Sequence, residues 1–514
     1  MPNMVIATYY NALRGFRHVI LPAACGLILA TSMPGPGWWI AAWVGLVPLM
    51  LALRVANARR AALQGLIAGI IYYAIILRWV ALFGTLPWVL LTIYQSLYLA
   101  VFGVLYVRVA PHRIGKLGYL AVPAAWTALQ FLRSLSPYAF IWGNLAHSQA
   151  NCLPIAQISS ITGAWGIDFL LCFVSLAISA AIDNKPRSMT PLYAAAALVG
   201  GVLIFGMVSL RGFEPDHHGR KIAIVQGNMK NDFNPIPNFI PMAIEKYSRL
   251  TQLAAKSKPS VILWPESAIP TDISDGYIIN TIADIAVASN TCLLVGGYEV
   301  PDPIDSSCIY NALLAFDASG ELTGSYRKAH LVPYGEFVPL RNKLRFLDRY
   351  GIRDEDLCPA KEHVLIDTPI GKIGASICFE STFSHISRNE TYRGAEVLCV
   401  VSNDAWFQRT SAAEQHLMMA RLRAIENRRF LLRAAGTGIS AVIDPTGRIR
   451  HQIGLFEEGI ITCEVTPSHD LSIYTLFGDW LPYASIVVAL IGLVSAPVKL
   501  RRSARDKNNR KHGA

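Results

Sequence analysis

Charged side chains are scarce in this chain. Asp, Glu, Lys and Arg make up 16% of the 514 residues, whereas 53% of the residues are hydrophobic. Soluble domains carry about 25% charged residues, and a positive mean hydropathy is unusual among them. Outside residues 211–479 the chain contains only three acidic residues. These deficits exclude a protein that is soluble over its whole length, and they predict a membrane protein.

Several sequence signals of metal sites and repeat proteins are also absent. The nine cysteines include no C-x-x-C spacing, which argues against a zinc site. We find no internal repeat, and no low-complexity segment beyond a basic C-terminal tail. We therefore expect no metal ion and no other cofactor. Disulfides are permitted outside the cytoplasm, but the sequence does not require one.

The formal net charge of +11 does not indicate a nucleic-acid-binding protein. Residues 211–479 contain 27 Lys or Arg against 32 Asp or Glu, so the positive excess belongs to the apolar remainder. A protein that binds a polyanion clusters its basic residues on the folded domain. We expect no nucleic acid partner.

Long apolar runs account for the hydrophobic composition. Eight segments have the length and composition of membrane-spanning helices. They cover roughly residues 18–33, 38–56, 61–84, 88–110, 117–135, 165–182, 191–210 and 480–500. Arg14 and Arg17 before the first segment, with the small residues 30–32 after it, would also fit a cleaved signal peptide. The charge pattern of the connections favours retention of this segment.

Basic residues alternate between the connections. Lys and Arg occur in connections 54–60, 108–116 and 185–187 and in tail 501–511, and they are absent from 34–37, 85–87 and 136–164. Since cytoplasmic connections are enriched in Lys and Arg, both termini are predicted to be cytoplasmic. We divide the chain into a bundle of seven spans (1–210), a domain outside the cytoplasm (211–479), and a last span with its basic tail (480–514).

The polar domain mixes strands and helices. We predict strands at 221–226, 261–264, 292–298, 396–402, 430–444 and 448–465, helices at 238–256, 276–289, 414–428 and from about Ser381, and hairpins at 307–328 and 363–377. This mixture indicates layered α/β architecture and not an all-parallel doubly wound sheet.

Three segments of this domain carry reactive side chains at predicted strand ends. Glu266 lies in Trp-Pro-Glu-Ser, Lys328 ends Tyr-Arg-Lys, and Cys378 lies in Ile-Cys-Phe-Glu. A carboxylate that deprotonates a thiol, with an ammonium that stabilises an oxyanion, can perform acyl transfer through a thioester. Cys378 alone would be read as an inert strand cysteine, and its two companions reverse that interpretation.

These motifs resemble the Glu-Lys-Cys triad of the nitrilase superfamily. The eight spans, with such a domain inserted before the last one, resemble a membrane-embedded branch of that superfamily, the bacterial apolipoprotein N-acyltransferases. Residues 225–228 (Val-Gln-Gly-Asn), 403–407 (Asn-Asp-Ala-Trp-Phe) and 415–421 belong to the same resemblance. It implies a polytopic α-helical membrane bundle joined to a nitrilase-like αββα sandwich.

The resemblance also implies a reaction and its partners. Cys378 would attack the sn-1 ester of a phospholipid, typically phosphatidylethanolamine, and the thioester would pass the acyl chain to the amine of a diacylglyceryl-cysteine apolipoprotein. Glu266 would move the protons in this ping-pong cycle, and Lys328 would stabilise the oxyanions and lower the thiol pKa. The protein would lie in the bacterial inner membrane with its catalytic domain in the periplasm.

Further residues are expected to support the site. Glu336 corresponds to a second glutamate of the family, and Glu380 would fix the loop around the thiol unless it is a surface carboxylate. The substrate-binding candidates are Phe379, Trp406, Phe233, Asn228 and Tyr334. Trp406 has a plain alternative as a core aromatic, and Phe379 stands where many relatives carry Tyr.

Two other functions compete with this hypothesis. A membrane-anchored amidohydrolase with the same triad would pass its thioester to water. A transporter with an accessory domain is prompted by Arg78, Arg133 and Asp168, because ionisable groups within spans are expensive and often functional. The simpler reading is that Arg133 and Asp168 lie near helix ends and either snorkel or pair.

The predicted orientation can be tested with a topology reporter. A reporter enzyme that is active only outside the cytoplasm, fused after Arg510, should be inactive, and the same enzyme inserted between residues 230 and 236 should be active. The positive-inside rule gives this expectation. Activity of the fusion after Arg510 would contradict the predicted topology.

Overall fold

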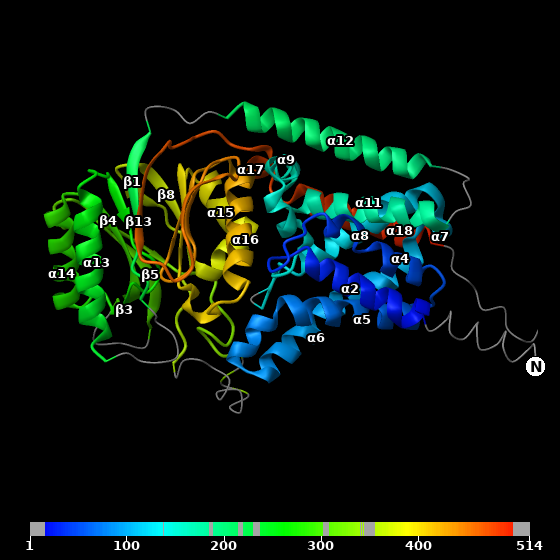
Figure 1. Cartoon of the computed structure of the whole chain (residues 1–514), viewed down its shortest axis with the longest axis horizontal. Coiled ribbons are helices and arrows are strands. Elements are labelled where there is room, and N and C mark those ends of the chain that lie inside the picture. Colours follow the sequence, from blue (N-terminus) through cyan, green and yellow to red (C-terminus); the bar gives the residue numbers. More distant parts are fainter. Residues whose placement is uncertain are drawn as a thin grey trace, which may run out of the picture.

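The chain folds into a helical bundle and an α/β domain that lie end to end along the long axis of the molecule (Figure 1). The structure is a computed structural model. It describes residues 16–136, 138–183, 189–213, 219–229, 237–301, 308–339, 341, 343 and 355–496.

The bundle contains long helices joined by shorter helical pieces. Its elements are η1 (Phe16–Ile20), α2 (Leu21–Thr31), α3 (Ala41–Val44), α4 (Val47–Leu53), α5 (Ala58–Ile76), η2 (Arg78–Phe83), α6 (Thr85–Val109), α7 (Pro111–Ile114), η3 (Gly115–Leu117), α8 (Gly118–Leu132), α11 (Trp165–Asp183), α12 (Thr190–Arg211) and α18 (Trp480–Val494). The connection between α8 and α11 contains η4 (Leu145–Asn151), α9 (Leu153–Ala156) and α10 (Ser159–Thr162).

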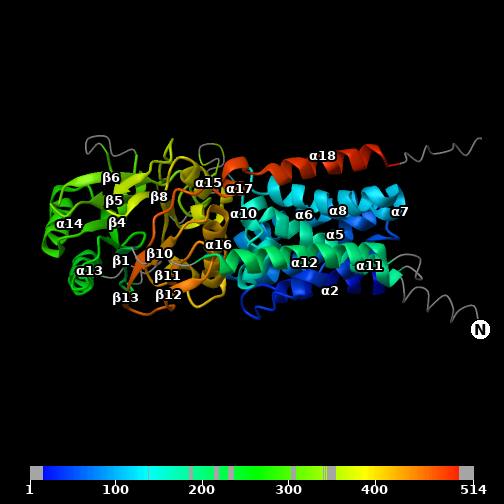
Figure 2. The ribbon, with the colours of Figure 1, turned by 90° about the horizontal axis from the view of Figure 1, so that it is seen from above.

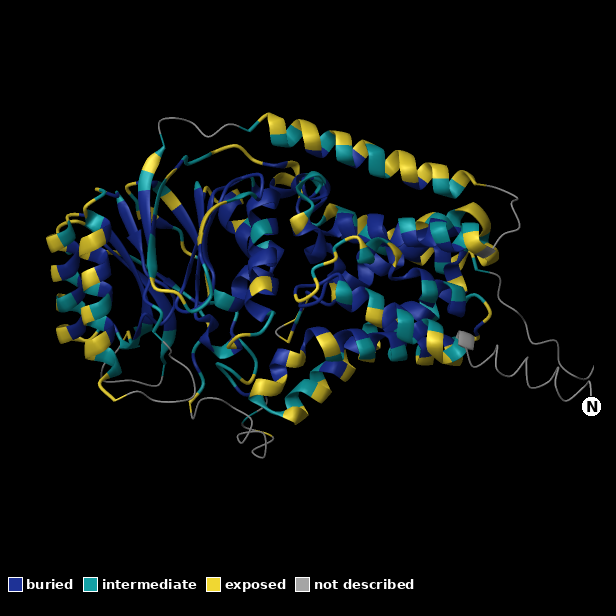
Figure 3. Ribbon diagram, in the orientation of Figure 1, coloured by how far each residue is buried: buried dark blue, intermediate teal, exposed yellow. Residues whose placement is uncertain are grey.

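Part of this bundle meets the length and hydropathy expected of membrane-spanning helices. Among the described residues, three helical runs are long and apolar enough to cross a membrane: Thr85–Leu132, Trp165–Ile182 and Thr190–Arg211. Each of the eight predicted segments contains helix, but the number of spans stays a prediction. Helix α12 runs along one side of the bundle and is largely exposed (Figure 3), as expected for a helix that faces lipid.

Small residues set the close approach of α5 and α6. A Cβ atom added at Gly65 would overlap the backbone carbonyl of Leu99, and one added at Gly69 would lie 2.8 Å from the Cα atom of Ser96. Helices in membranes associate through such small residues, because lipid supplies no hydrophobic driving force between helices.

Two β-sheets form the centre of the α/β domain. The first has the order β13-β1-β2-β4-β5-β6, with β3 also pairing β4, and the second has the order β12-β11-β10-β9-β8-β7. The strands are β1 (Arg220–Gln226), β2 (Val261–Leu263), β3 (Ile269–Asp272), β4 (Cys292–Glu299), β5 (Tyr310–Phe316), β6 (Leu322–Arg327), β7 (Ile366–Thr368), β8 (Gly371–Ile377), β9 (Val397–Ser402), β10 (Leu431–Ala435), β11 (Ser440–Ile443), β12 (Ile449–Ile453) and β13 (Gly459–Val465). Apolar side chains of both sheets pack between them, including Ile224, Leu263 and Val401.

Helices cover both outer faces of the sheet pair. Helices α13 (Phe239–Ala255) and α14 (Gly276–Ser289) pack on the first sheet. Helices α15 (Ser384–Tyr392) and α16 (Ala412–Asn427) lie between the second sheet and the bundle, beside the short α17 (Ile473–Phe477) (Figure 2). The predicted nitrilase-like αββα arrangement is therefore present.

Three predicted elements differ from the structure. The predicted strand 430–444 is a hairpin of β10 and β11, because residues 436–439 turn the chain back. The predicted strand 448–465 divides into β12 and β13, which belong to different sheets. The helix expected from about Ser381 begins at Ser384, after a 3₁₀ turn, η6 (Cys378–Thr382).

Helix α16 joins the two parts of the molecule and is buried on nearly all sides. The Glu426 carboxylate accepts a hydrogen bond of 3.0 Å from the backbone N–H of Ala164. The Arg428 guanidinium, directly after the helix, donates to the side chains of Gln157 and Ser160 at 3.0 Å each. Contact between the bundle and the domain is thus made by specific polar bonds as well as by apolar packing.

The glycine contacts of α5 and α6 give a stability prediction. Replacing Gly65 by Val should push the two helices apart and cost about 1–3 kcal/mol, the usual cost of overpacking. The melting temperature of the purified protein measures this effect. Gly201→Val on α12 is the matched control, because a Cβ at Gly201 meets no atom within 4 Å. Equal melting temperatures for the two variants would contradict the proposed packing role.

Candidate active site

The three reactive side chains lie at the ends of three strands. Glu266 follows β2, Lys328 follows β6 directly, and Cys378 follows β8 directly. The Nζ atom of Lys328 lies 3.7 Å from Oε1 of Glu266, and the charges of both groups act on the Cys378 thiol. The structure therefore brings together the base, the cation and the thiol that the sequence predicts.

Lys328 is held by a second carboxylate. Its ammonium, only 1% exposed, donates a 2.9 Å hydrogen bond to Oε1 of Glu336. The other oxygen of Glu336 accepts from the backbone N–H of Val332 at 2.8 Å, which closes the turn after β6. Burial alone would lower the pKa of Lys328, but the carboxylates of Glu336 and Glu266 raise it above its ordinary value. Lys328 therefore remains charged.

Asn311 connects the two carboxylates. Its Nδ2 atom lies 2.8 Å from Oε1 of Glu266 and 3.0 Å from Oε1 of Glu336. The other oxygen of Glu266 accepts from the backbone N–H of Asn403 at 2.6 Å. Burial and the neighbouring charge of Glu336 raise the pKa of Glu266, although Lys328 and the donors Asn311 and Asn403 oppose this shift. A raised pKa suits a carboxylate that must take up and return a proton.

The surroundings of Cys378 favour the protonated thiol over the thiolate. Burial raises its pKa well above the usual value, and the charge of Glu266 raises it further. The ammonium of Lys328 lowers the thiol pKa, as predicted, but burial outweighs this effect. The thiol thus needs a base to become a nucleophile.

Glu380 is not a surface carboxylate. It is fully buried and accepts four hydrogen bonds. Oε1 receives the backbone N–H groups of Ala329 and His330 at 2.8 and 2.9 Å, and Oε2 receives the Tyr326 hydroxyl and the Ile377 N–H at 2.8 Å each. One carboxylate therefore ties the segment after Lys328 to the residue before Cys378, which is the role predicted from the sequence.

Aromatic side chains cover the nucleophile segment on the side of the bundle. The ring of Phe379 stacks on Trp142, with 6.4 Å between centroids and an interplanar angle of 11°, and also contacts Phe140 and Phe383. Trp142 is buried and not an interfacial anchor. Connection 136–164 thus lies over the segment that carries Cys378. Phe379 packs through its ring alone, because it has no hydroxyl group.

A cavity of about 830 Å³ lies between the bundle and the catalytic domain. Its wall includes Phe131 from α8, Tyr483 from α18, and residues 329–331 directly after Lys328. Phe337, part of the apolar loop after Glu336, also lines it. The cavity therefore adjoins the segment after Lys328 and the ends of α8 and α18 that lie nearest the α/β domain.

The remaining predicted binding residues have different surroundings. Asn228 has a left-handed backbone (φ +48°) and donates to the Phe456 carbonyl at 2.9 Å. Trp406 is half-buried on η7 (Asp404–Phe407) and packs against the apolar core. The Tyr334 side chain is 39% exposed in a tight turn. Phe233 lies outside the described residues.

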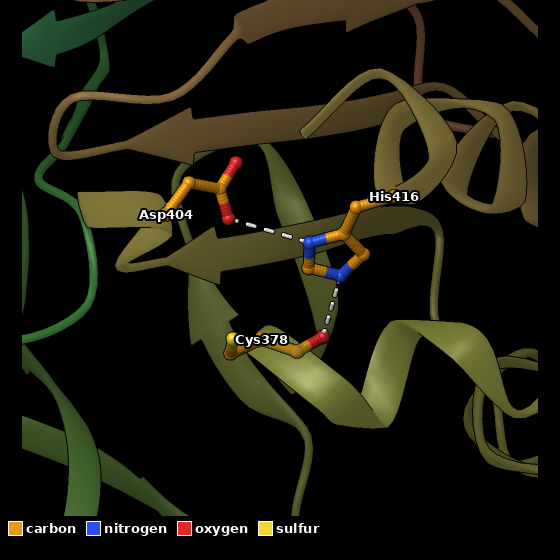
Figure 4. Close-up of side chains that lie close together, drawn as sticks. All are labelled: Cys378, Asp404 and His416. Carbon is orange, nitrogen blue, oxygen red and sulfur yellow. Dashed lines mark hydrogen bonds and ion pairs between the residues drawn. The ribbon is translucent and has the colours of Figure 1, made fainter. Parts of the chain in front are cut away.

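A buried cluster beside the Cys378 backbone was not predicted. His416 lies with its Nε2 atom 3.0 Å from the carbonyl oxygen of Cys378 and its Nδ1 atom 3.3 Å from Asp404 (Figure 4). Cys378, Asp404 and His416 are close enough to suggest a metal site. However, the Arg433 guanidinium lies 2.9 Å from Asp404 and 3.0 Å from Nδ1 of His416. This fixed positive charge opposes the binding of a cation.

Arg133 and Asp168, two of the three charges that suggested a transporter, make hydrogen bonds with the connection between α8 and α11. Arg133 donates to the carbonyl oxygens of Ile141 and Trp142 at 2.9 and 3.1 Å. Asp168 accepts from Asn144 at 2.7 Å, and Arg78 is exposed. Both buried groups therefore shape the connection that covers Cys378.

The sequence analysis did not predict Asn311, and it noted Asn403 and His416 only within the motifs of the resemblance, without a role. Asn311 and Arg433 each interrupt an apolar strand, and a polar residue within such a strand requires a partner when it is buried. That signal was available in the sequence. The partners themselves come from distant segments, so spacing could not identify them.

Two family models match the chain. Residues 221–469 match the carbon-nitrogen hydrolase family, and residues 25–177 match the apolipoprotein N-acyltransferase N-terminal domain.

Similar proteins cover nearly the whole chain. The apolipoprotein N-acyltransferase of Geobacter metallireducens is 31% identical over 493 residues, which is 92% of this chain and 94% of that protein. The apolipoprotein N-acyltransferase of Gloeobacter violaceus is 29% identical and covers 96% of each chain. Among solved structures, an amidase from Nesterenkonia sp. is 16% identical and covers 50% of this chain and 94% of its own, with a TM-score of 0.39.

The bonds of Glu380 give the prediction for this site. Glu380→Gln preserves shape, but an amide cannot accept all four bonds, so at least one buried N–H loses its acceptor. We expect a loss of about 1–3 kcal/mol in unfolding free energy, measured as a lower melting temperature. Glu362→Gln, at an exposed position, is the control. A melting temperature for Glu380→Gln equal to that of the control would show that the bonds are not needed.

Proposed function

The chain belongs to the apolipoprotein N-acyltransferase family, and from this premise we propose that Cys378 carries a fatty acyl chain from a phospholipid to the N-terminal amine of a diacylated apolipoprotein. The observation that supports this proposal most strongly is the buried arrangement of Glu266, Lys328 and Glu336 beside the thiol. Phosphatidylethanolamine is our proposed donor, with the acyl chain taken from sn-1.

The first half of the reaction forms the thioester. Glu266 accepts the thiol proton of Cys378, and the sulfur attacks the ester carbonyl carbon of the phospholipid. The ammonium of Lys328 stabilises the oxyanion that develops. When the intermediate collapses, the C–O bond breaks, Glu266 returns its proton to the departing oxygen, and a lysophospholipid leaves.

The second half transfers the acyl chain. The neutral N-terminal amine of the apolipoprotein attacks the thioester carbonyl, and Lys328 again stabilises the oxyanion. Glu266 accepts the amine proton and delivers it to the Cys378 thiolate as the C–S bond breaks. The carboxylate therefore returns to its starting state, which gives a ping-pong cycle in which a single base serves both halves.

The surroundings of Cys378 support a lipid substrate. Aromatic rings cover its segment toward the bundle, and the 830 Å³ cavity is shared by membrane helices and catalytic loops. An acyl chain is apolar and suits such walls. An amidohydrolase needs water at its thioester, and the apolar cover disfavours that alternative.

We also propose that residues 211–479 form the catalytic domain in the periplasm, against the outer face of the inner membrane. Cys308 and Cys358 form a disulfide within this domain. Disulfides persist mainly in oxidising compartments, which supports the proposed location. The positive-inside pattern of the connections supports the same orientation.

Mass spectrometry of the peptides of the full-length protein tests the proposal. After incubation with phospholipid and no acceptor, the peptide that contains Cys378 should carry one fatty acyl group, because no amine is available to remove it. Cys378→Ala should carry none. Cys463→Ala, which removes a half-buried thiol of β13, should keep the adduct.

The acceptor distinguishes the competing enzyme. A diacylated lipopeptide should remove the acyl group from Cys378 and gain it at its own N-terminus. Loss of the adduct in water alone at an equal rate would support the amidohydrolase. An adduct at another residue, or none in the wild-type protein, would contradict the proposed role of Cys378.

A further inference from the structure

We propose that His416 is a positioning residue for the acyl transfer, which holds the backbone of Cys378 through a single hydrogen bond whose direction Arg433 imposes. This inference rests on the proposed function, in which Cys378 is the nucleophile. His416 does not touch the thiol and would act through the peptide group that carries it (Figure 4).

The backbone of Cys378 requires such support. Its φ angle is +53°, in the left-handed region that L-residues other than Gly, Asn and Asp seldom adopt. A residue held there persists only when the surrounding structure fixes it. The Cys378 carbonyl oxygen is fixed by two groups, Nε2 of His416 at 3.0 Å and the Ser381 hydroxyl at 2.8 Å.

The direction of the His416 bond follows from its partners. Nε2 lies 3.0 Å from the Cys378 carbonyl oxygen, which can only accept, and 2.8 Å from the Ser381 hydroxyl, whose own proton goes to the same carbonyl. Nε2 therefore carries a proton and donates it. At Nδ1 the nearest partner is Nη2 of Arg433 at 3.0 Å, and a guanidinium can only donate. Nδ1 therefore accepts, and the imidazole is neutral with its proton on Nε2. Burial and the charge of Arg433 lower the pKa of His416, although Asp404 opposes this shift.

The same cluster reaches the base. Arg433 is held by Oδ2 of Asp404 at 2.9 Å, and Oδ1 of Asp404 accepts from the Ser402 hydroxyl at 2.5 Å. The residue between them, Asn403, donates its N–H to Glu266 at 2.6 Å. His416, Arg433, Asp404 and Ser402 are all fully buried. Hydrogen bonds within this cluster thus connect the Cys378 backbone to the Glu266 carboxylate.

Two amide variants of His416 separate positioning from folding. A Gln side chain can place an amide N–H near the position of Nε2, whereas Asn is one methylene too short to reach the Cys378 carbonyl. The rate of acyl adduct formation on Cys378 is measured at increasing phospholipid concentration with the full-length protein. His451→Ala, at an exposed position of β12, is the control.

We expect His416→Asn to lower the limiting rate of adduct formation about 100-fold, the effect of displacing a reacting group by about 1 Å. The half-saturating phospholipid concentration should stay unchanged, because His416 contacts the Cys378 backbone and does not line the cavity. His416→Gln should retain most of the wild-type rate. Combining His416→Asn with Glu266→Gln should cost much less than the product of the two separate effects, since the base is already misplaced.

Three results would overturn the inference. These are equal limiting rates for the Asn and Gln variants, a rate for His416→Asn equal to that of the control, or independent effects of His416→Asn and Glu266→Gln. Absence of any adduct in the wild-type protein is a different result. It would contradict the proposed function itself.

Discussion

One buried positive charge organises the catalytic domain. The Lys328 ammonium is almost completely removed from water, which is tolerated only when charges of the opposite sign compensate it. Glu336 and Glu266 provide that compensation, and Asn311 holds both carboxylates in place. Since two carboxylates face one ammonium, a negative charge remains in excess. That excess, together with burial, gives Glu266 its affinity for a proton.

The membrane bundle completes the active site as well as anchoring it. Arg133 and Asp168 fix the connection whose Trp142 covers Phe379. The apolar core of the bundle continues without a break into the catalytic domain through Phe379 and Phe383. In the proposed mechanism, this cover would shield a thioester at Cys378 from bulk water until an amine arrives.

The sequence analysis predicted the features that local sequence patterns determine. Strand ends marked by apolar runs led to Glu266, Lys328 and Cys378, and turn residues predicted the two hairpins. It failed where tertiary contacts decide. Three of the four partners of Glu380 lie about 50 residues away in the chain, and His416 lies 38 residues from Cys378, so no spacing rule can find these contacts. One further miss was local: residues 436–438 are Gly-Thr-Gly, a turn signal inside the predicted strand, and they separate β10 from β11.

Helix α16 has almost no face that belongs to solvent. One side packs on the second sheet, and the other meets the bundle, where Glu426 and the adjoining Arg428 find partners in the 157–164 segment. Separating the α/β domain from the bundle would expose the apolar surface that α16 shares with the bundle, because the two halves share one interior.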